Sequence, residues 1–69
     1  MKIKMLKTIT VETKGHNEEG FIVRETLQLF KDDVQEGITI VKERKGNAEV
    51  VFADGFTGSI PTNTFEKIV

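Results

Sequence analysis

Apolar and polar residues alternate along much of this chain at the two-residue period of a β-strand. The first alternating segment is Lys2–Glu12, in which lysines and threonines separate isoleucine, methionine and valine. Leu6 breaks the phase of this alternation, so we expect a bulge or bend at Leu6-Lys7. Thr13–Gly20 contains two glycines and an asparagine, which suit a backbone reversal, and is predicted to be a loop.

The next segment, Phe21–Phe30, fits two different patterns. Its apolar residues at 21, 23, 27 and 29 share one face of a strand, so we predict a strand over 21–29. Leu27, Phe30 and Val34 also share one face of a helix, and Gly37 stands where such a helix would end. A short helix within 25–36 is therefore the alternative.

The second half of the chain predicts short strands separated by turns. The expected strands are Ile38–Glu43, which should be central in its sheet, then Glu49–Ala53, Phe56–Ile60 and Phe65–Val69. Within Glu49–Ala53 three large apolar residues follow one another, which suits a strand that is buried on both faces.

Turn-forming residues separate these strands. Lys45-Gly46-Asn47 is expected to be a short turn. Asp54-Gly55 suits a two-residue hairpin turn in which both central residues have positive φ. Pro61 cannot donate a hydrogen bond to a neighbouring strand and should end the strand before it. Thr62-Asn63-Thr64 is then a turn into the last strand.

Length and composition bound the class of protein. A chain of 69 residues is expected to form a single domain over 1–69. It has no cysteine, which excludes disulfides, thiolate metal sites and cysteine nucleophiles and favours a cytoplasmic location. No apolar run approaches the length of a membrane span, so no membrane partner is expected.

The residues that carry chemistry are few. His16 is the only histidine and Ser59 the only serine, so nothing predicts a nucleophile with its base. His16 with Glu18 and Glu19 has no second histidine or cysteine to complete a metal site. We therefore expect a non-catalytic protein without a metal or a cofactor.

From Val34 to Ile68 the chain resembles a Src-homology-3 small barrel. Gly58-Ser59-Ile60-Pro61-Thr62-Asn63 matches the family's G-x-I-P-x-N signature, and Phe65 takes the closing apolar position. Asp54-Gly55 falls where the family has its tight distal hairpin. The resemblance implies a mostly β fold, a five- or six-stranded antiparallel small barrel, with one helical turn after the signature.

The aromatic residues with which this family grips proline-rich peptides are missing. Glu49-Val50-Val51 stands in the region of the family's tryptophan, Thr64 takes the place of a tyrosine, and residues 8–12 contain no aromatic. A polyproline groove depends on stacking against aromatic walls. The sequence thus predicts a protein-binding module that lacks this groove.

The resemblance also implies a location for the binding surface. In the family, the loop corresponding to Lys14–Glu19 and the turn after the signature proline lie side by side and form the ligand face. The candidate partner-binding residues are therefore His16, Asn17, Pro61, Thr62, Asn63 and Thr64.

The alternative function is a nucleic-acid-binding small barrel. Charge alternates along the chain in blocks, basic over 1–14 and 38–47 and acidic over 15–37 and 48–69. If the first strand pairs with the central sheet, the two basic blocks would come together in a surface formed by Lys2, Lys4, Lys7, Lys42, Arg44 and Lys45. The net charge of −1 argues against this function.

Overall fold

The computed structural model describes residues 1–68, and strands account for 62% of it. In chain order the elements are β1 (Lys2–Met5), β2 (Ile9–His16), β3 (Ile22–Leu29), β4 (Val34–Gln35), β5 (Thr39–Arg44), β6 (Asn47–Val51), β7 (Thr57–Pro61), the 3₁₀ helix η1 (Thr62–Thr64) and β8 (Phe65–Ile68). The predicted mostly β class is confirmed. The last residue of the expected strand Phe65–Val69 lies outside the described residues.

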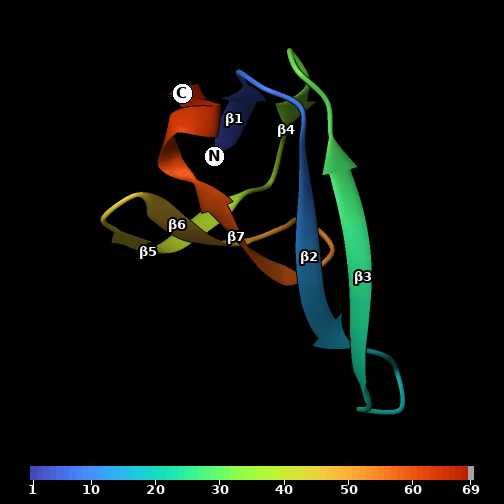
Figure 1. Cartoon of the computed structure of the whole chain (residues 1–69). Coiled ribbons are helices and arrows are strands. Elements are labelled where there is room, and N and C mark those ends of the chain that lie inside the picture. Colours follow the sequence, from blue (N-terminus) through green and yellow to red (C-terminus); the bar gives the residue numbers. More distant parts are fainter. Residues whose placement is uncertain (69) are drawn as a thin grey trace.

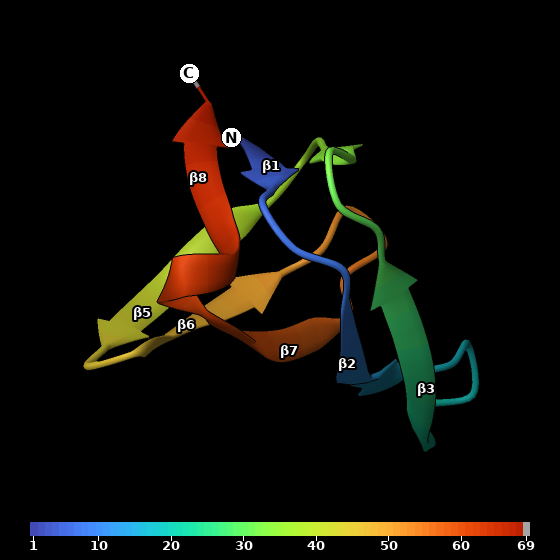
Figure 2. The same cartoon turned by 45° about the horizontal axis from the view of Figure 1, so that its top comes forward.

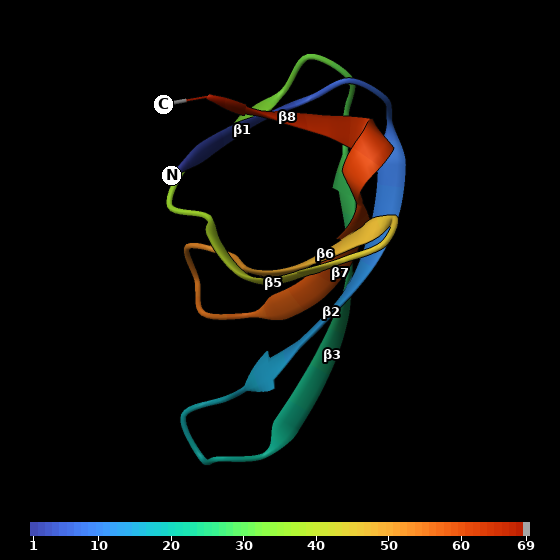
Figure 3. The same ribbon diagram turned by 90° about the vertical axis from the view of Figure 1, so that its left-hand side faces the viewer.

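The strands form two antiparallel sheets (Figures 1 and 2). One has three strands in the order β4-β1-β8, and the other has five in the order β3-β2-β7-β6-β5. The five-stranded sheet is open, because β3 and β5 each pair on one side only within the described chain. Figure 3 shows β1 and β8 lying across the interior from β5, β6 and β7.

The first alternating segment is two strands and not one. The predicted break at Leu6-Lys7 is confirmed in position, but there the chain leaves one sheet and enters the other. Two hydrogen bonds hold the bend: the Leu6 amide donates to the Thr64 carbonyl over 2.8 Å, and the Lys31 amide donates to Thr8 Oγ1 over 2.9 Å. Thr64 and Lys31 are distant in sequence from the bend. The local pattern therefore indicated a break in the strand but not that the chain changes sheets there.

Half of the predicted loop Thr13–Gly20 is strand. β2 continues to His16 and pairs with β3 along eight positions, from Ile9 opposite Leu29 to His16 opposite Ile22. Thr13 is buried and its Oγ1 donates to the Glu25 carbonyl, which satisfies the hydroxyl inside the sheet. Pairing with β3 thus extends β2 through polar residues that show no alternation. The alternative helix within 25–36 does not form, since β3 runs to Leu29 and a turn follows.

The second half of the chain is a meander, β5-β6-β7, whose strands are shifted relative to the prediction. Ile38–Glu43 was expected to be central, but β5 is an edge strand and begins at Thr39, while Ile38 is buried just before it. β6 ends at Val51, so Phe52 fills the core from the following turn and not from a strand. The predicted turn at Thr62–Thr64 is confirmed and is a 3₁₀ helix.

The hairpin at Asp54-Gly55 has three loop residues, not two. Gly55 has φ of 90°, but Asp54 does not have positive φ. The Gly55 amide donates to the Phe52 carbonyl, the Phe52 amide donates to the Phe56 carbonyl, and Asp54 Oδ1 accepts from the Phe56 amide. This is a turn followed by one left-handed glycine, which extends the loop by a residue.

We expect Gly55→Val to lower the free energy of unfolding by about 1–2 kcal/mol, because a side chain at positive φ strains the backbone. No atom lies within 4 Å of a Cβ at this position, so the loss would come from the backbone alone. Urea denaturation measures it, with Ser59→Val on an exposed strand position as the control. An unchanged midpoint for Gly55→Val would contradict the positive φ.

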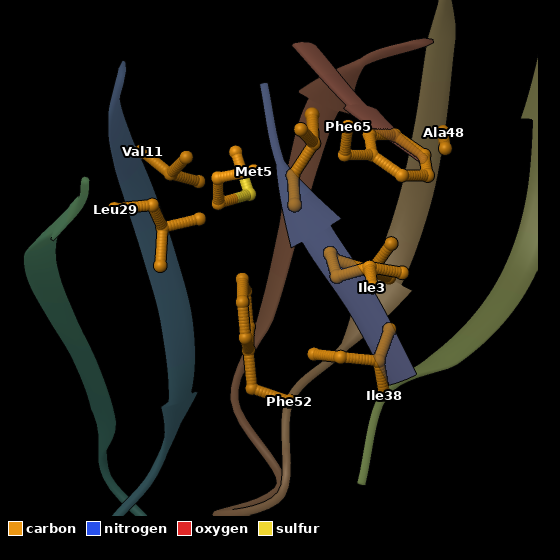
Figure 4. Close-up of a cluster of buried hydrophobic side chains, with 10 residues drawn as sticks. Ile3, Met5, Val11, Leu29, Ile38, Ala48, Phe52 and Phe65 are labelled. Atoms are coloured by element: carbon orange, nitrogen blue, oxygen red, sulfur yellow. The ribbon is translucent and has the colours of Figure 1, made fainter. Parts of the chain in front are cut away.

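One hydrophobic core lies between the two sheets (Figure 4). β1 and β8 contribute from the three-stranded sheet, and β2, β3, β6 and β7 contribute from the other. The buried residues are Ile3, Met5, Val11, Leu29, Ile38, Ala48, Val50, Phe52, Ile60 and Phe65. Because these side chains occupy one face of each sheet, the opposite face of the five-stranded sheet is left for solvent or for a partner.

Candidate groove on the outer face of the sheet

The two regions predicted to form one binding face lie apart. His16 ends β2, and Asn17 begins the loop at the tip of the β2–β3 hairpin. In Figures 1 and 3 this tip projects away from the helical turn that precedes β8. That turn, η1, instead meets the β5–β6 turn, where the Thr62 amide donates to the Gly46 carbonyl over 3.0 Å. The neighbourhood that the resemblance implied is therefore wrong.

Two of the candidate residues shape the backbone. Thr64 is only 5% exposed, and its Oγ1 donates to the Pro61 carbonyl over 2.6 Å, so it is not accessible to a partner. Asn17 Oδ1 accepts hydrogen bonds from the Glu19 and Phe21 amides, each over 3.0 Å, and stabilises the hairpin loop. His16, Pro61, Thr62 and Asn63 are exposed, but they lie at two separate places.

The basic residues do not meet as the nucleic-acid alternative required. β1 pairs with β4 and β8 and not with the five-stranded sheet, so Lys2 and Lys4 lie on the other layer from Lys42 and Arg44. Lys2 pairs with Glu36 over 3.1 Å, and Arg44 pairs with Glu49 over 3.7 Å. Glu36 and Glu49 thus lie beside basic side chains and reduce the positive potential that a phosphate would meet.

A concave surface lies on the outer face of the five-stranded sheet. This hollow, here called the outer groove, has a volume of about 410 Å³. The residues around it come from β2, β5, β6 and β7: Glu12, Lys14, Val41, Glu49, Val50, Val51, Thr57, Gly58 and Ser59. Most of their side chains belong to the sheet face that does not contribute to the core.

An apolar side chain lies in the outer groove, beside a β-bulge. β5 and β6 pair regularly until Ile40 opposite Val50, and the register then shifts, so that Lys42 is opposite Glu49 and Val41 has no partner. Val41 is 64% exposed on the face opposite to Ile40, which packs against the core, as alternation along a strand requires. Bulges occur often beside functional sites.

The other residues that line the groove have short side chains or are charged, and the charges are of both signs. Val51, Thr57 and Ser59 have short side chains and form part of its lining. Gly58 lets β7 approach the core closely, since a Cβ there would lie 3.0 Å from Val11 Cγ1. Glu12, Lys14 and Glu49 supply two negative charges and one positive charge. The arrangement suits an apolar side chain flanked by polar groups.

A second hollow of about 320 Å³ lies beside the end of β2, where His16 and Asp54 are among its lining residues. Phe56 also lines it, and its ring lies so near Gly15 that a Cβ at Gly15 would be 2.7 Å from Phe56 Cδ1. This contact joins the β2–β3 hairpin to the β6–β7 loop. Within residues 1–68 no three His, Asp or Glu side chains are grouped as metal ligands would be.

The sequence contained one signal for the groove that the prediction did not use. Val41 is out of phase with Ile38 and Ile40, which both face the core. Because Ile38 and Ile40 share one face of a strand, the same period places Val41 on the opposite face. The other groove residues are small or charged and resemble any solvated strand face.

No protein family model matches this chain, and no curated protein or solved structure matches it either. Among residues 1–68 there is no helix whose length and apolar character would let it cross a membrane.

Proposed function

We propose that this chain is a non-catalytic binding module for another protein, and that the outer groove is its contact surface. The observation that carries the proposal is Val41, an apolar side chain 64% exposed inside a concave surface. Removal of exposed apolar surface from water is the main favourable term in most protein–protein association. The partner would insert an apolar side chain beside Val41 and Val51 and place polar groups against Glu12, Lys14 and Glu49.

The charge around the groove favours a protein partner over a nucleic acid. Phosphate contacts need clustered lysines and arginines. The groove has Lys14 against Glu12 and Glu49, and Glu49 is paired with Arg44. A protein surface with charges of both signs is the better complement to this rim.

We also propose that the scaffold is a Src-homology-3-like small barrel. Its support is the order of the elements: β1 pairs with β8, β5-β6-β7 is a meander, and a 3₁₀ turn precedes the last strand. The open five-stranded sheet and the projecting β2–β3 hairpin are departures from a closed barrel. Because the aromatic positions of the family are held by Glu49–Val51 and Thr64, the partner would not be a proline-rich peptide.

Val41→Asp tests the groove. We expect this variant to fold like the wild type, because Val41 is exposed, and to lose at least about tenfold in affinity for the partner, because a charge would then be buried unpaired. The measurement is capture of a partner from extract of the native host, followed by titration with the identified protein. Thr10→Asp, an exposed outer-face position on β2 that does not line the groove, is the matched control.

Two results would contradict this proposal. If Val41→Asp binds the captured protein as tightly as the wild type, the contact surface is elsewhere. If the chain instead binds single-stranded DNA with an affinity that falls steeply with salt, and loses it on Lys42→Ala, the nucleic-acid alternative is correct.

A further inference from the structure

β3 has an open edge that is unusually regular for a strand of this length. It runs over Ile22–Leu29, pairs with β2 at eight consecutive positions without a register shift, and contains no proline. No strand of the described chain pairs with its other side. Such an edge is a template for another strand unless it is blunted.

The backbone groups that this edge presents follow from the pairing of β2 with β3. The Asn17 amide donates to the Phe21 carbonyl, which makes these two residues a hydrogen-bonded pair. Hydrogen-bonded and non-hydrogen-bonded pairs alternate along antiparallel strands, so the odd-numbered residues of β3 bond to β2. The amides and carbonyls of Ile22, Arg24, Thr26 and Gln28 therefore point away from β2.

The opposite edge strand of the same sheet, β5, is better protected than β3 against pairing with another strand. β5 contains the bulge at Val41, and its exposed side chains include Lys42 and Arg44. Bulges and basic side chains are common devices against edge-to-edge pairing. β3 has one basic residue, Arg24, and no bulge.

Symmetry limits the ways in which two β3 strands can pair. In an antiparallel pair about a two-fold axis perpendicular to the sheet, one residue faces its own copy on the axis. An axis at Arg24 or at Glu25 would place like charges directly opposite each other, which destabilises a sheet. An axis at Thr26 places two small hydroxyl side chains opposite each other and overlaps residues 23–29 of both copies, all within β3.

The Thr26 register also covers exposed apolar surface. Ile22, 63% exposed, would lie beside the turn that follows β3 of the second copy, where Phe30 is 52% exposed and its amide and carbonyl bond to Asp33. Arg24 would lie opposite Gln28 of the second copy, so no charge meets its like across the pair. Arg24, Thr26 and Gln28 all have outward-pointing backbone groups, so each would exchange hydrogen bonds with its opposite residue.

We propose that two copies of this chain associate through β3, antiparallel, with Thr26 on the two-fold axis. The two five-stranded sheets then continue into one another. The outer groove lies on β2, β5, β6 and β7 and includes no residue of β3, so this association does not depend on the groove being a binding site.

Substitution of Thr26 by residues of opposite charge tests the proposed register. Thr26→Glu and Thr26→Lys each place like charges opposite each other, so we expect each variant alone to dimerise at least about tenfold more weakly than the wild type. An equimolar mixture should form the heterodimer, because opposite charges then meet. Sedimentation velocity measures all three, and Thr39→Glu on the exposed surface of β5 is the control, expected to dimerise like the wild type.

Amide hydrogen exchange gives a readout without any substitution. In the dimer, the amides of Arg24, Thr26 and Gln28 should become protected as the protein concentration rises. A wild-type chain that remains monomeric up to about 1 mM would overturn the proposal. So would a mixture of folded Thr26→Glu and Thr26→Lys chains that stays monomeric, or a Thr26→Glu variant that dimerises as well as the wild type.

Discussion

Ile60→Ala is expected to lower the free energy of unfolding by about 2–5 kcal/mol, the range for truncating a large buried aliphatic side chain. Ile60 is 0% exposed and lies on β7 opposite Ala48 of β6, within the core between the two sheets. Alanine would remove apolar contacts and leave a cavity that two sheets, each held by its own hydrogen bonds, cannot close. A chain of 69 residues has a total stability of roughly 3–10 kcal/mol, so this loss would unfold much of the population.

Thermal or urea denaturation followed by circular dichroism would measure this effect. Ser59→Ala is the matched control, because Ser59 is the preceding residue on the opposite, exposed face of β7 and should change stability by less than about 0.5 kcal/mol. Equal losses for the two variants would mean that β7 does not separate a core face from a solvent face.

Gly37→Ala is expected to lower the free energy of unfolding by about 2–4 kcal/mol, because two effects add. Gly37 has φ of 71°, which strains any residue with a side chain, and its new Cβ would lie 2.9 Å from the Ala53 Cβ. The Ala53 Cβ is attached directly to the backbone and cannot rotate away. The chain between β4 and β5 would have to move, and with it the buried Ile38.

Gly46→Ala separates the two effects. Gly46 also has positive φ, at 87°, but no atom lies within 4 Å of a Cβ there. It should therefore cost only the backbone strain, about 1–2 kcal/mol. Denaturation midpoints of both variants give the comparison, and a Gly37→Ala loss no greater than that of Gly46→Ala would show that the contact with Ala53 is absent.

Much of the strand content could be predicted from local pattern alone. The residues around β3, β5, β7 and β8 alternate or carry turn residues at their ends, and each was expected within a few positions. The break at Leu6-Lys7 was also visible, because Leu6 is out of phase with its neighbours. These features depend on interactions within a few residues, which the sequence records directly.

The extent of each strand was harder to predict. Thr13, Gly15 and His16 have no alternation that marks them as strand, and they are held in β2 by pairing with β3. Asp54 was expected at positive φ, but hydrogen bonds of Phe52 with both Gly55 and Phe56 select a longer loop. In both places a partner on the next strand decides the backbone conformation.

The candidate binding surface was the least predictable part. The loop at His16 and the turn at Thr62 were expected to be neighbours, but one lies at the tip of a projecting hairpin and the other beside the β5–β6 turn. The groove around Val41 depends on four strands that come from separate parts of the chain. No local pattern reports which strands will share a sheet.

The sequence by itself determined that this chain is mostly β, where it turns, and which apolar residues can enter a core, because side-chain alternation and turn chemistry act over short distances. Only the tertiary structure decided that β1 and β2 belong to different sheets, that β3 and β5 are edges, and that Val41 faces outward. Those outcomes depend on hydrogen bonds and packing between residues far apart in the chain. The groove and the open edge of β3 are both products of that long-range pairing.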